Sequence, residues 1–243
     1  MAETVKAKVG FVSPVSGASP HIESFKLLVP DGVQMDIDGL ELIRDSFYDF
    51  RGKTQAVVDR VKELVRANEW QGVFVGGAPL ELMNPGLAEA LHRGINVPST
   101  TALESCVTAL KAFSAKQFLL MTPFDDSMNQ RIKDYLAVEG LTAISPNSPF
   151  KSHRDAGKLT PEEVLSLTRR SLEGVTEIQA IYFQGGVLDP LEVVKEIEGE
   201  SSKPVVASNP AMLWHILSRL GFKCSVPGRG RLMEEWPALP LQG

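Results

Sequence analysis

The chain has 243 residues, 43% of them hydrophobic and 23% charged, with a formal net charge of −5 at pH 7. This composition is typical of a folded protein, and an acidic balance without clustered lysine and arginine argues against a nucleic-acid partner. No apolar run approaches the roughly 18 residues of a membrane span, and the first residues are polar, so we expect no membrane partner. With Cys106 and Cys224 as the only cysteines, the sequence predicts no disulfide framework and a cytoplasmic location.

Strand-like apolar runs alternate with amphipathic helical patterns in the first half of the chain. The helical period is clearest where Val57, Val61 and Leu64 recur on one face. The predicted strands cover residues 8–13, 33–37, 72–75 and 95–98, and the predicted helices cover 55–67, 86–93 and 102–113.

The second half repeats this alternation. Thr160, Pro161 and Glu163 are typical of a helix start, with a capping hydroxyl, a first-turn proline and acids against the helix dipole. The predicted strands cover residues 117–122, 180–183 and 204–207, and the predicted helices cover 126–139, 161–172, 191–198 and 211–220.

Two segments of the chain echo each other. Residues 72–80 and 180–188 each consist of an apolar strand that runs into a glycine pair. A helical pattern and a second strand follow each copy, and that strand ends in residues 97–102 in the first copy and 206–211 in the second. A duplicated strand–helix–strand unit places two sets of strand ends around one shared cleft.

The predicted fold is therefore α/β, with two pseudo-symmetric, doubly wound, Rossmann-like lobes containing parallel sheets. We assign residues 1–115 together with 205–243 to the first lobe and residues 116–204 to the second. In folds of this kind ligands bind outside the carboxyl ends of the strands, so the site is expected in the cleft between the lobes.

The candidate ligand-binding residues follow predicted strands. Glycine turns that lead into helices expose backbone N–H groups, which suit a carboxylate or a phosphate, and neighbouring hydroxyls could add donors. The alternative is that glycine only permits a tight turn at these positions. The predicted binding set comprises Pro14, Ser16, Gly17, Gly76, Gly77, Ala78, Thr100, Thr101, Phe124, Gln184, Gly185, Gly186, Ser208 and Asn209.

Groups that could transfer a proton are few. His21 follows the first strand and is the histidine expected nearest the cleft, with Ser16 and Asp125 as further candidates. For Asp125 the competing interpretation is a helix N-cap. Cys106 lies on the apolar side of its helix, which favours a structural thiol. The four histidines lack metal-ligand spacing and no nucleotide-binding glycine motif is complete, so we expect neither metal nor cofactor.

Several motifs resemble the aspartate/glutamate racemase superfamily, and within it arylmalonate decarboxylase and maleate cis-trans isomerase most of all. The resemblance rests on the Ser-Asn-Pro-Ala-Met-Leu-Trp segment (208–214) and on Thr122-Pro123-Phe124 followed by Asn129. It extends to residues 13–17 and 230–232 and so covers nearly the whole chain. It implies two pseudo-symmetric α/β lobes with a cofactor-free site between them, where a carbanion forms next to a carboxylate.

In that family the racemases place one cysteine on each face of the substrate, and the decarboxylase keeps only the second. By the resemblance these two positions fall on Gly77 and Gly185 of this chain. Ala78 and Pro79 stand where the family often carries hydroxyls, and Phe124 stands where it commonly has a tyrosine. Glycine can neither donate a proton nor attack a double bond.

Three functions stay open from the sequence. The first is lyase-type chemistry on a small carboxylic acid, with the proton supplied by water, His21, Ser16 or Asp125. The second is a non-catalytic protein that binds a small carboxylate on the same fold. The third is a diverged hydrolase in which Gln184 or Asp125 positions water. A small carboxylate is the expected partner in the first two, and a homo-oligomer is a further possibility.

Overall fold

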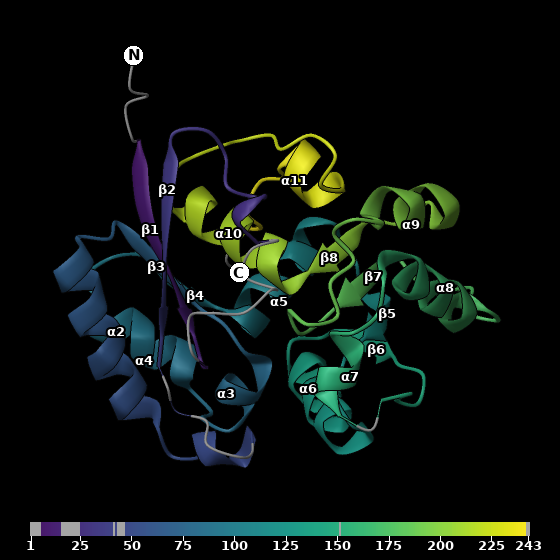
Figure 1. The fold of residues 1–243 in the computed structure, drawn as a ribbon, viewed down its shortest axis with the longest axis horizontal. Coiled ribbons are helices and arrows are strands. Elements are labelled where there is room, and N and C mark those ends of the chain that lie inside the picture. The colour runs from purple at the N-terminus through teal and green to yellow at the C-terminus, as the bar shows by residue number, and fades with distance from the viewer. Residues whose placement is uncertain (1–5, 16–24, 41, 43–46, 151, 242–243) are drawn as a thin grey trace.

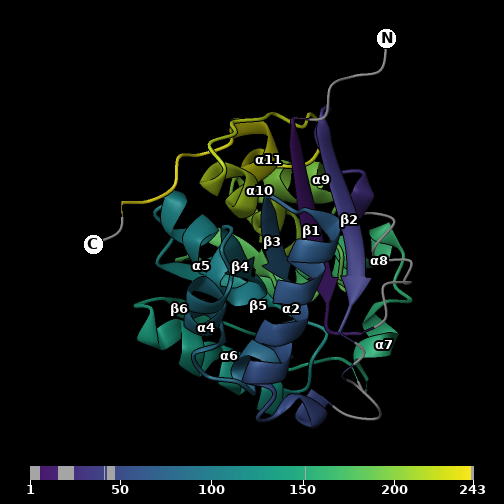
Figure 2. The ribbon, with the colours of Figure 1, turned by 90° about the vertical axis from the view of Figure 1, so that its left-hand side faces the viewer.

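The computed structural model of the protein describes residues 6–15, 25–40, 42, 47–150 and 152–241. In this part of the chain the first four strands form one parallel sheet in the order β2-β1-β3-β4. The strands are β1 (Ala7–Ser13), β2 (Val33–Gly39), β3 (Gly72–Val75) and β4 (Ser99–Thr101). Helices α2 (Thr54–Asn68) and α4 (Leu87–Gly94) lie over its outer face, as Figure 2 shows.

The second sheet repeats the first, again with parallel pairs, in the order β6-β5-β7-β8. Its strands are β5 (Gln117–Met121), β6 (Thr142–Ile144), β7 (Ala180–Phe183) and β8 (Val205–Ala207). Strands β5 to β8 occupy the same places in the second sheet as β1 to β4 do, in that order, in the first sheet. The predicted α/β fold with two pseudo-symmetric lobes is confirmed.

Helices α5 (Ala102–Ala112) and α10 (Ser208–Arg219) pack against each other between the two sheets (Figure 1). Each directly follows an edge strand, β4 or β8, and is largely buried. The largest hydrophobic core contains side chains from both sheets and from both helices, so the lobes share one interior.

The other helices lie around the two sheets. They are α3 (Ala78–Leu82), α6 (Asp126–Val138), α7 (His153–Ala156), α8 (Pro161–Leu172), α9 (Val194–Ser201), α11 (Arg231–Glu235) and the 3-10 helix η1 (Phe47–Phe50). No helix in the described ranges combines the length and apolarity that a bilayer crossing requires.

Three elements are displaced by three or four residues from the sequence prediction. The strand predicted at residues 95–98 lies at 99–101, the helix predicted at 191–198 lies at 194–201, and α10 begins at Ser208 rather than at residue 211. Pro210 does not delay the start of α10, because the N–H groups of a first turn need no partner within the helix. The elements α3, β6, α7 and α11 were not predicted, because three to five residues are too few to show a period.

The division between the lobes also differs in detail. Strand β8 belongs to the second sheet, although the predicted boundary at residue 205 assigns it to the first lobe. The chain leaves the second sheet after Ala207, and α10 then packs on β3, β4 and α5. The remaining division follows the two sheets, with β1 to β4 before residue 115 and β5 to β7 after it.

Candidate active site

A cavity of about 190 Å³ lies where the carboxyl ends of the central strands of both sheets meet. Each of these strands contributes residues at or just after its end: Ser13 and Pro14 for β1, Gly76 and Gly77 for β3, Pro123 and Phe124 for β5, and Gln184 and Gly185 for β7. Drug-sized sites usually enclose roughly 300–1,000 Å³. The cavity therefore suits a small acid.

Most of the cavity wall is apolar. Phe11 and Phe25 meet edge to face with ring centroids 5.1 Å apart, and both line the cavity on the side of the first sheet. Phe50, Phe124 and Met212 extend this surface. The described wall contains no lysine, arginine, aspartate or glutamate. An apolar wall of this kind removes water from a bound molecule and strengthens each remaining polar contact.

The turns after β3 and β7 are built alike. The amide of Gly76 donates to Val12 O at 2.9 Å, and the amide of Gln184 donates to Met121 O at the same distance. The next residue in each turn has a positive φ, +93° at Gly77 and +104° at Gly185. L-residues with a side chain rarely adopt such values, so both positions favour glycine.

A proline packs against each of these two glycines. A Cβ on Gly77 would lie 2.7 Å from Cγ of Pro14, and a Cβ on Gly185 would lie 2.9 Å from Cγ and Cδ of Pro123. Real Cβ atoms do not approach other atoms this closely. The space that a side chain would need at either position is therefore already filled.

Backbone donors remain available in both turns. The amides of Gly77, Ala78, Gly186 and Val187 donate no hydrogen bond to any residue in the described part of the chain. All four residues line the cavity. A carboxylate or an enediolate bound there can accept from these amides, which is how an oxyanion hole stabilises developing charge. The start of α10 at Ser208 adds the positive end of a twelve-residue helix.

Internal hydrogen bonds hold two polar side chains of the cavity wall, those of Gln184 after β7 and Ser208 at the start of α10. The Tyr182 hydroxyl donates to Oε1 of Gln184, which turns the NH₂ of that carboxamide away from Tyr182. Ser208 Oγ accepts from the amide of Gly185 at 3.0 Å and donates to Phe183 O at 3.3 Å. The proton of the Ser208 hydroxyl is thus used within the protein, and this side chain fixes the turn.

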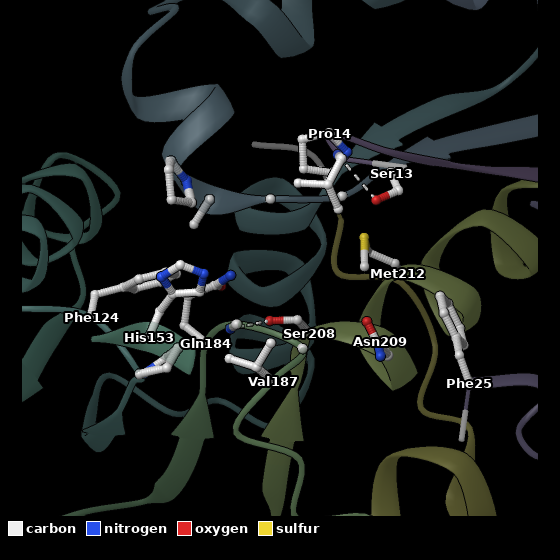
Figure 3. Close-up of a pocket in the computed structure, with 18 of the residues that line it drawn as sticks. Ser13, Pro14, Phe25, Phe124, His153, Gln184, Val187, Ser208, Asn209 and Met212 are labelled. Atoms are coloured by element: carbon white, nitrogen blue, oxygen red, sulfur yellow. Dashed lines mark hydrogen bonds between the residues drawn. The ribbon is translucent and has the colours of Figure 1, made fainter. Parts of the chain in front are cut away.

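His153 lines the same cavity from the first position of α7. Figure 3 shows it on the wall that carries Phe124 and Gln184, across the cavity from Ser13 and Pro14. Burial lowers the pKa of the His153 imidazole below its usual range; the positive charge of Arg154 acts in the same direction, and Asp155 opposes it.

The family model of arylmalonate decarboxylase matches residues 9–233. The chain belongs to the arylmalonate decarboxylase family. Arylmalonate decarboxylase of Bordetella bronchiseptica is 27% identical over 190 residues, which cover 74% of this chain and 79% of that protein. The structure of unliganded arylmalonate decarboxylase superposes with a TM-score of 0.81 at 25% identity, covering 95% of this chain and 100% of that one.

A maleate cis-trans isomerase structure from Nocardia farcinica shares the fold at 19% identity, with a TM-score of 0.74 and coverage of 94% of this chain and 98% of that one. That structure is a cysteine-to-serine mutant with a covalently bound succinylcysteine intermediate. In this member of the arylmalonate decarboxylase family neither cysteine reaches the cavity. Cys106 is fully buried in α5, where burial raises the pKa of its thiol to about 12, and Cys224 does not line the cavity.

Most of the binding residues predicted from the sequence meet in the cavity. Three predicted residues, Ser16, Gly17 and His21, lie outside the described residues. The predicted residues that line the cavity are Pro14, Gly76, Gly77, Ala78, Phe124, Gln184, Gly185, Gly186, Ser208 and Asn209.

Three predicted residues lie elsewhere. The Thr100 hydroxyl, on the edge strand β4, is 2.8 Å from Oγ of Ser105 and 2.9 Å from Nδ1 of His215, inside the contact between α5 and α10. Thr101 is the N-cap residue of α5, so this strand runs directly into a helix instead of opening onto the cavity. Asp125 is the exposed N-cap of α6, with Oδ1 accepting from the Met128 amide at 2.8 Å. Asp125 was considered both as a proton-transfer group and as a helix N-cap, and the structure confirms the N-cap.

Sequence reasoning predicted Phe124 but missed the other aromatic side chains of the wall and His153. Phe25 and Phe50 come from connections outside the strands, and no periodic pattern marks such residues as neighbours of a site. Pro123 also lines the cavity but was not among the predicted binding residues. It directly precedes the predicted residue Phe124 in the motif that carried the family resemblance, and this position could have indicated it. For His153 the sequence offered no signal, because the segment before α7 shows no regular pattern.

Proposed function

We propose that this protein decarboxylates a malonate-type acid with an apolar substituent, without a cofactor, through an enediolate held by the turns after β3 and β7. The observation that supports this most is the set of available amides at Gly77, Ala78, Gly186 and Val187 in an otherwise apolar cavity. The name of the family supplies the substrate class, an arylmalonate.

The chemistry requires two features that the cavity offers. When one carboxylate leaves as carbon dioxide, its electron pair moves through the central carbon onto the remaining carboxylate, which becomes an enediolate. Amide donors stabilise that developing charge, and the apolar wall disfavours the charged carboxylate that is lost. Phe11 and Phe25 provide a surface for an aryl group, since aromatic rings pack favourably edge to face.

Isomerisation of maleate is less well supported. The related isomerase was captured with a succinyl group on cysteine, which requires a sulfur nucleophile at the substrate. Neither Cys106 nor Cys224 lines the cavity, so neither can attack a substrate bound there. Decarboxylation needs no covalent attachment, and it is therefore the reaction in this family that these residues favour.

The test is to incubate the protein with phenylmalonate, methyl(phenyl)malonate and maleate and to follow each by NMR. We expect monocarboxylic acids and carbon dioxide from the two malonates and no fumarate from maleate. Failure to decarboxylate either malonate would overturn the proposed reaction. If the malonates then still raise the melting temperature, the protein is a carboxylate-binding member of the family without this activity.

A further inference from the structure

The described part of the cavity wall offers one side chain that exchanges a proton near neutral pH. Among the described lining residues there is no aspartate, glutamate, lysine, cysteine or tyrosine, and His153 is the only histidine. Neither hydroxyl on the wall is an acid near neutral pH, and that of Ser208 already donates to Phe183 O at 3.3 Å. The carbanion that decarboxylation leaves must nevertheless acquire a proton.

His153 stands on one side of the cavity only. It belongs to the wall of the second sheet with Phe124 and Gln184, while Ser13 and Pro14 form the opposite wall (Figure 3). A flat enediolate bound between the two walls presents one face to each. A donor on one wall delivers its proton to one face, and the product then forms as a single enantiomer.

We infer that His153 is a catalytic residue that protonates the enediolate from the side of the second sheet. This inference rests on the proposed decarboxylation. The bond between the central carbon and the leaving carboxylate breaks, and carbon dioxide departs without the electron pair. The pair returns from the enediolate to the central carbon, which takes the proton from the imidazolium nitrogen. The neutral imidazole regains its proton from water, so no oxidant, reductant or other reactant is consumed.

The charges around His153 couple its protonation to substrate binding. Arg154 and Asp155 of its own helix act on it in opposite directions, and the described lining residues include no lysine, arginine, aspartate or glutamate. Burial, with the charge of Arg154, lowers the pKa of the imidazole and favours its neutral form. A bound carboxylate brings negative charge to this wall and favours the imidazolium. The proton is thus taken up when the substrate binds, ready for transfer.

The decisive experiment compares the wild type with His153→Gln on methyl(phenyl)malonate, whose product is chiral. The readouts are the rate of decarboxylation and the enantiomeric ratio of the 2-phenylpropionate formed. We expect the wild type to give one enantiomer in clear excess. In His153→Gln we expect a nearly racemic product and a rate lower by about 10²–10⁴-fold, the usual contribution of a general acid. His92→Gln is the matched control, because His92 lies outside the cavity and bonds to Ser99 O.

The possible outcomes separate this inference from the proposed function. An unchanged enantiomeric excess in His153→Gln overturns the role of His153 while leaving the decarboxylase proposal in place. A wild type that decarboxylates neither malonate overturns the proposed function, and the inference falls with it.

A second readout does not depend on turnover. Calorimetric titration with phenylacetate in two buffers of different ionisation enthalpy measures the protons taken up on binding. We expect uptake in the wild type and none in His153→Gln or in a second variant, His153→Asn. Equal uptake in all three would also overturn the inference.

Discussion

Pro123 occupies the space that a side chain on Gly185 would need. A Cβ at residue 185 would stand 2.9 Å from two atoms of the proline ring, and Gly185 itself has a φ of +104°. The same relation joins Pro14 to Gly77 in the other lobe. Both backbone conformation and packing therefore favour glycine at positions 77 and 185.

This relation predicts a sharp contrast between two neighbouring glycines. We expect Gly185→Ala to lower the free energy of unfolding by about 1–3 kcal/mol, because the new methyl group meets Pro123 and the backbone conformation is strained. Gly186→Ala is the matched control, since its Cβ would meet only the end of the Asn209 side chain at 3.4 Å. Urea unfolding of both variants measures the difference, and equal losses would contradict the packing argument.

The contact between Pro123 and Gly185 also determines whether a cysteine fits at residue 185, where the family resemblance places the cysteine of the decarboxylase. Gly185→Cys alone is expected to yield a destabilised protein with no gain in decarboxylation rate, because Pro123 displaces the new side chain. Adding Pro123→Ala removes the ring and should recover at least half of the lost stability. Activity assays and urea unfolding on both variants test this. A single variant that is as stable as the wild type would show that the turn adapts, contrary to expectation.

The fold and much of the site could be predicted from the sequence, because the order of strands determines which residues meet. Parallel strands end at one edge of a sheet, so the residues after β1, β3, β5 and β7 had to meet if the two copies share a cleft. The rule failed for Thr100, because the strand predicted at residues 95–98 lies at 99–101, so Thr100 is inside β4 and its hydroxyl faces the contact between α5 and α10. Where a short strand ends depends on pairing that a single sequence does not reveal.

Other parts of the site depend on contacts between distant segments. His153 approaches the cavity from a four-residue helix, and Phe50 from a short 3-10 helix. Neither element is long enough to carry a period, and their positions follow from packing of the completed fold. The hydroxyl of Ser208 was predicted as a ligand donor, yet its proton is used by Phe183 O, a bond visible only in three dimensions.

Asn209 provides a test of anion binding at the start of α10. Its side chain is half-buried on the cavity wall, so Asn209→Asp places a carboxylate of the same shape beside the proposed ligand. We expect the affinity for phenylacetate to fall about tenfold or more, because like charges repel strongly in a weakly hydrated cavity. Calorimetry measures the change, with Asn147→Asp on an exposed loop as the control. Unaltered binding by Asn209→Asp would place the anion elsewhere.

Glu81 predicts a pH dependence of stability. This carboxyl group is 5% exposed, accepts from the Leu103 amide and the Tyr135 hydroxyl, each at 3.1 Å, and has no cationic partner among the described residues. Burial raises its pKa from 4.5 to about 7, with the charge of Glu104 adding to the effect. Between these two values the folded protein keeps a proton that the unfolded chain releases. The free energy of unfolding therefore falls as the pH rises through this window.

Glu81→Gln removes that dependence with a neutral side chain of the same shape, whose single carbonyl oxygen can still accept one of the two hydrogen bonds. We expect the wild type to lose on the order of 2–3 kcal/mol of stability relative to this variant between pH 5 and pH 8. Urea unfolding at the two pH values measures the difference. Glu89→Gln, an exposed change on α4, should behave like the wild type. If Glu81→Gln and the wild type instead lose stability in parallel, the carboxyl group is already ionised at pH 5 and burial does not control its protonation.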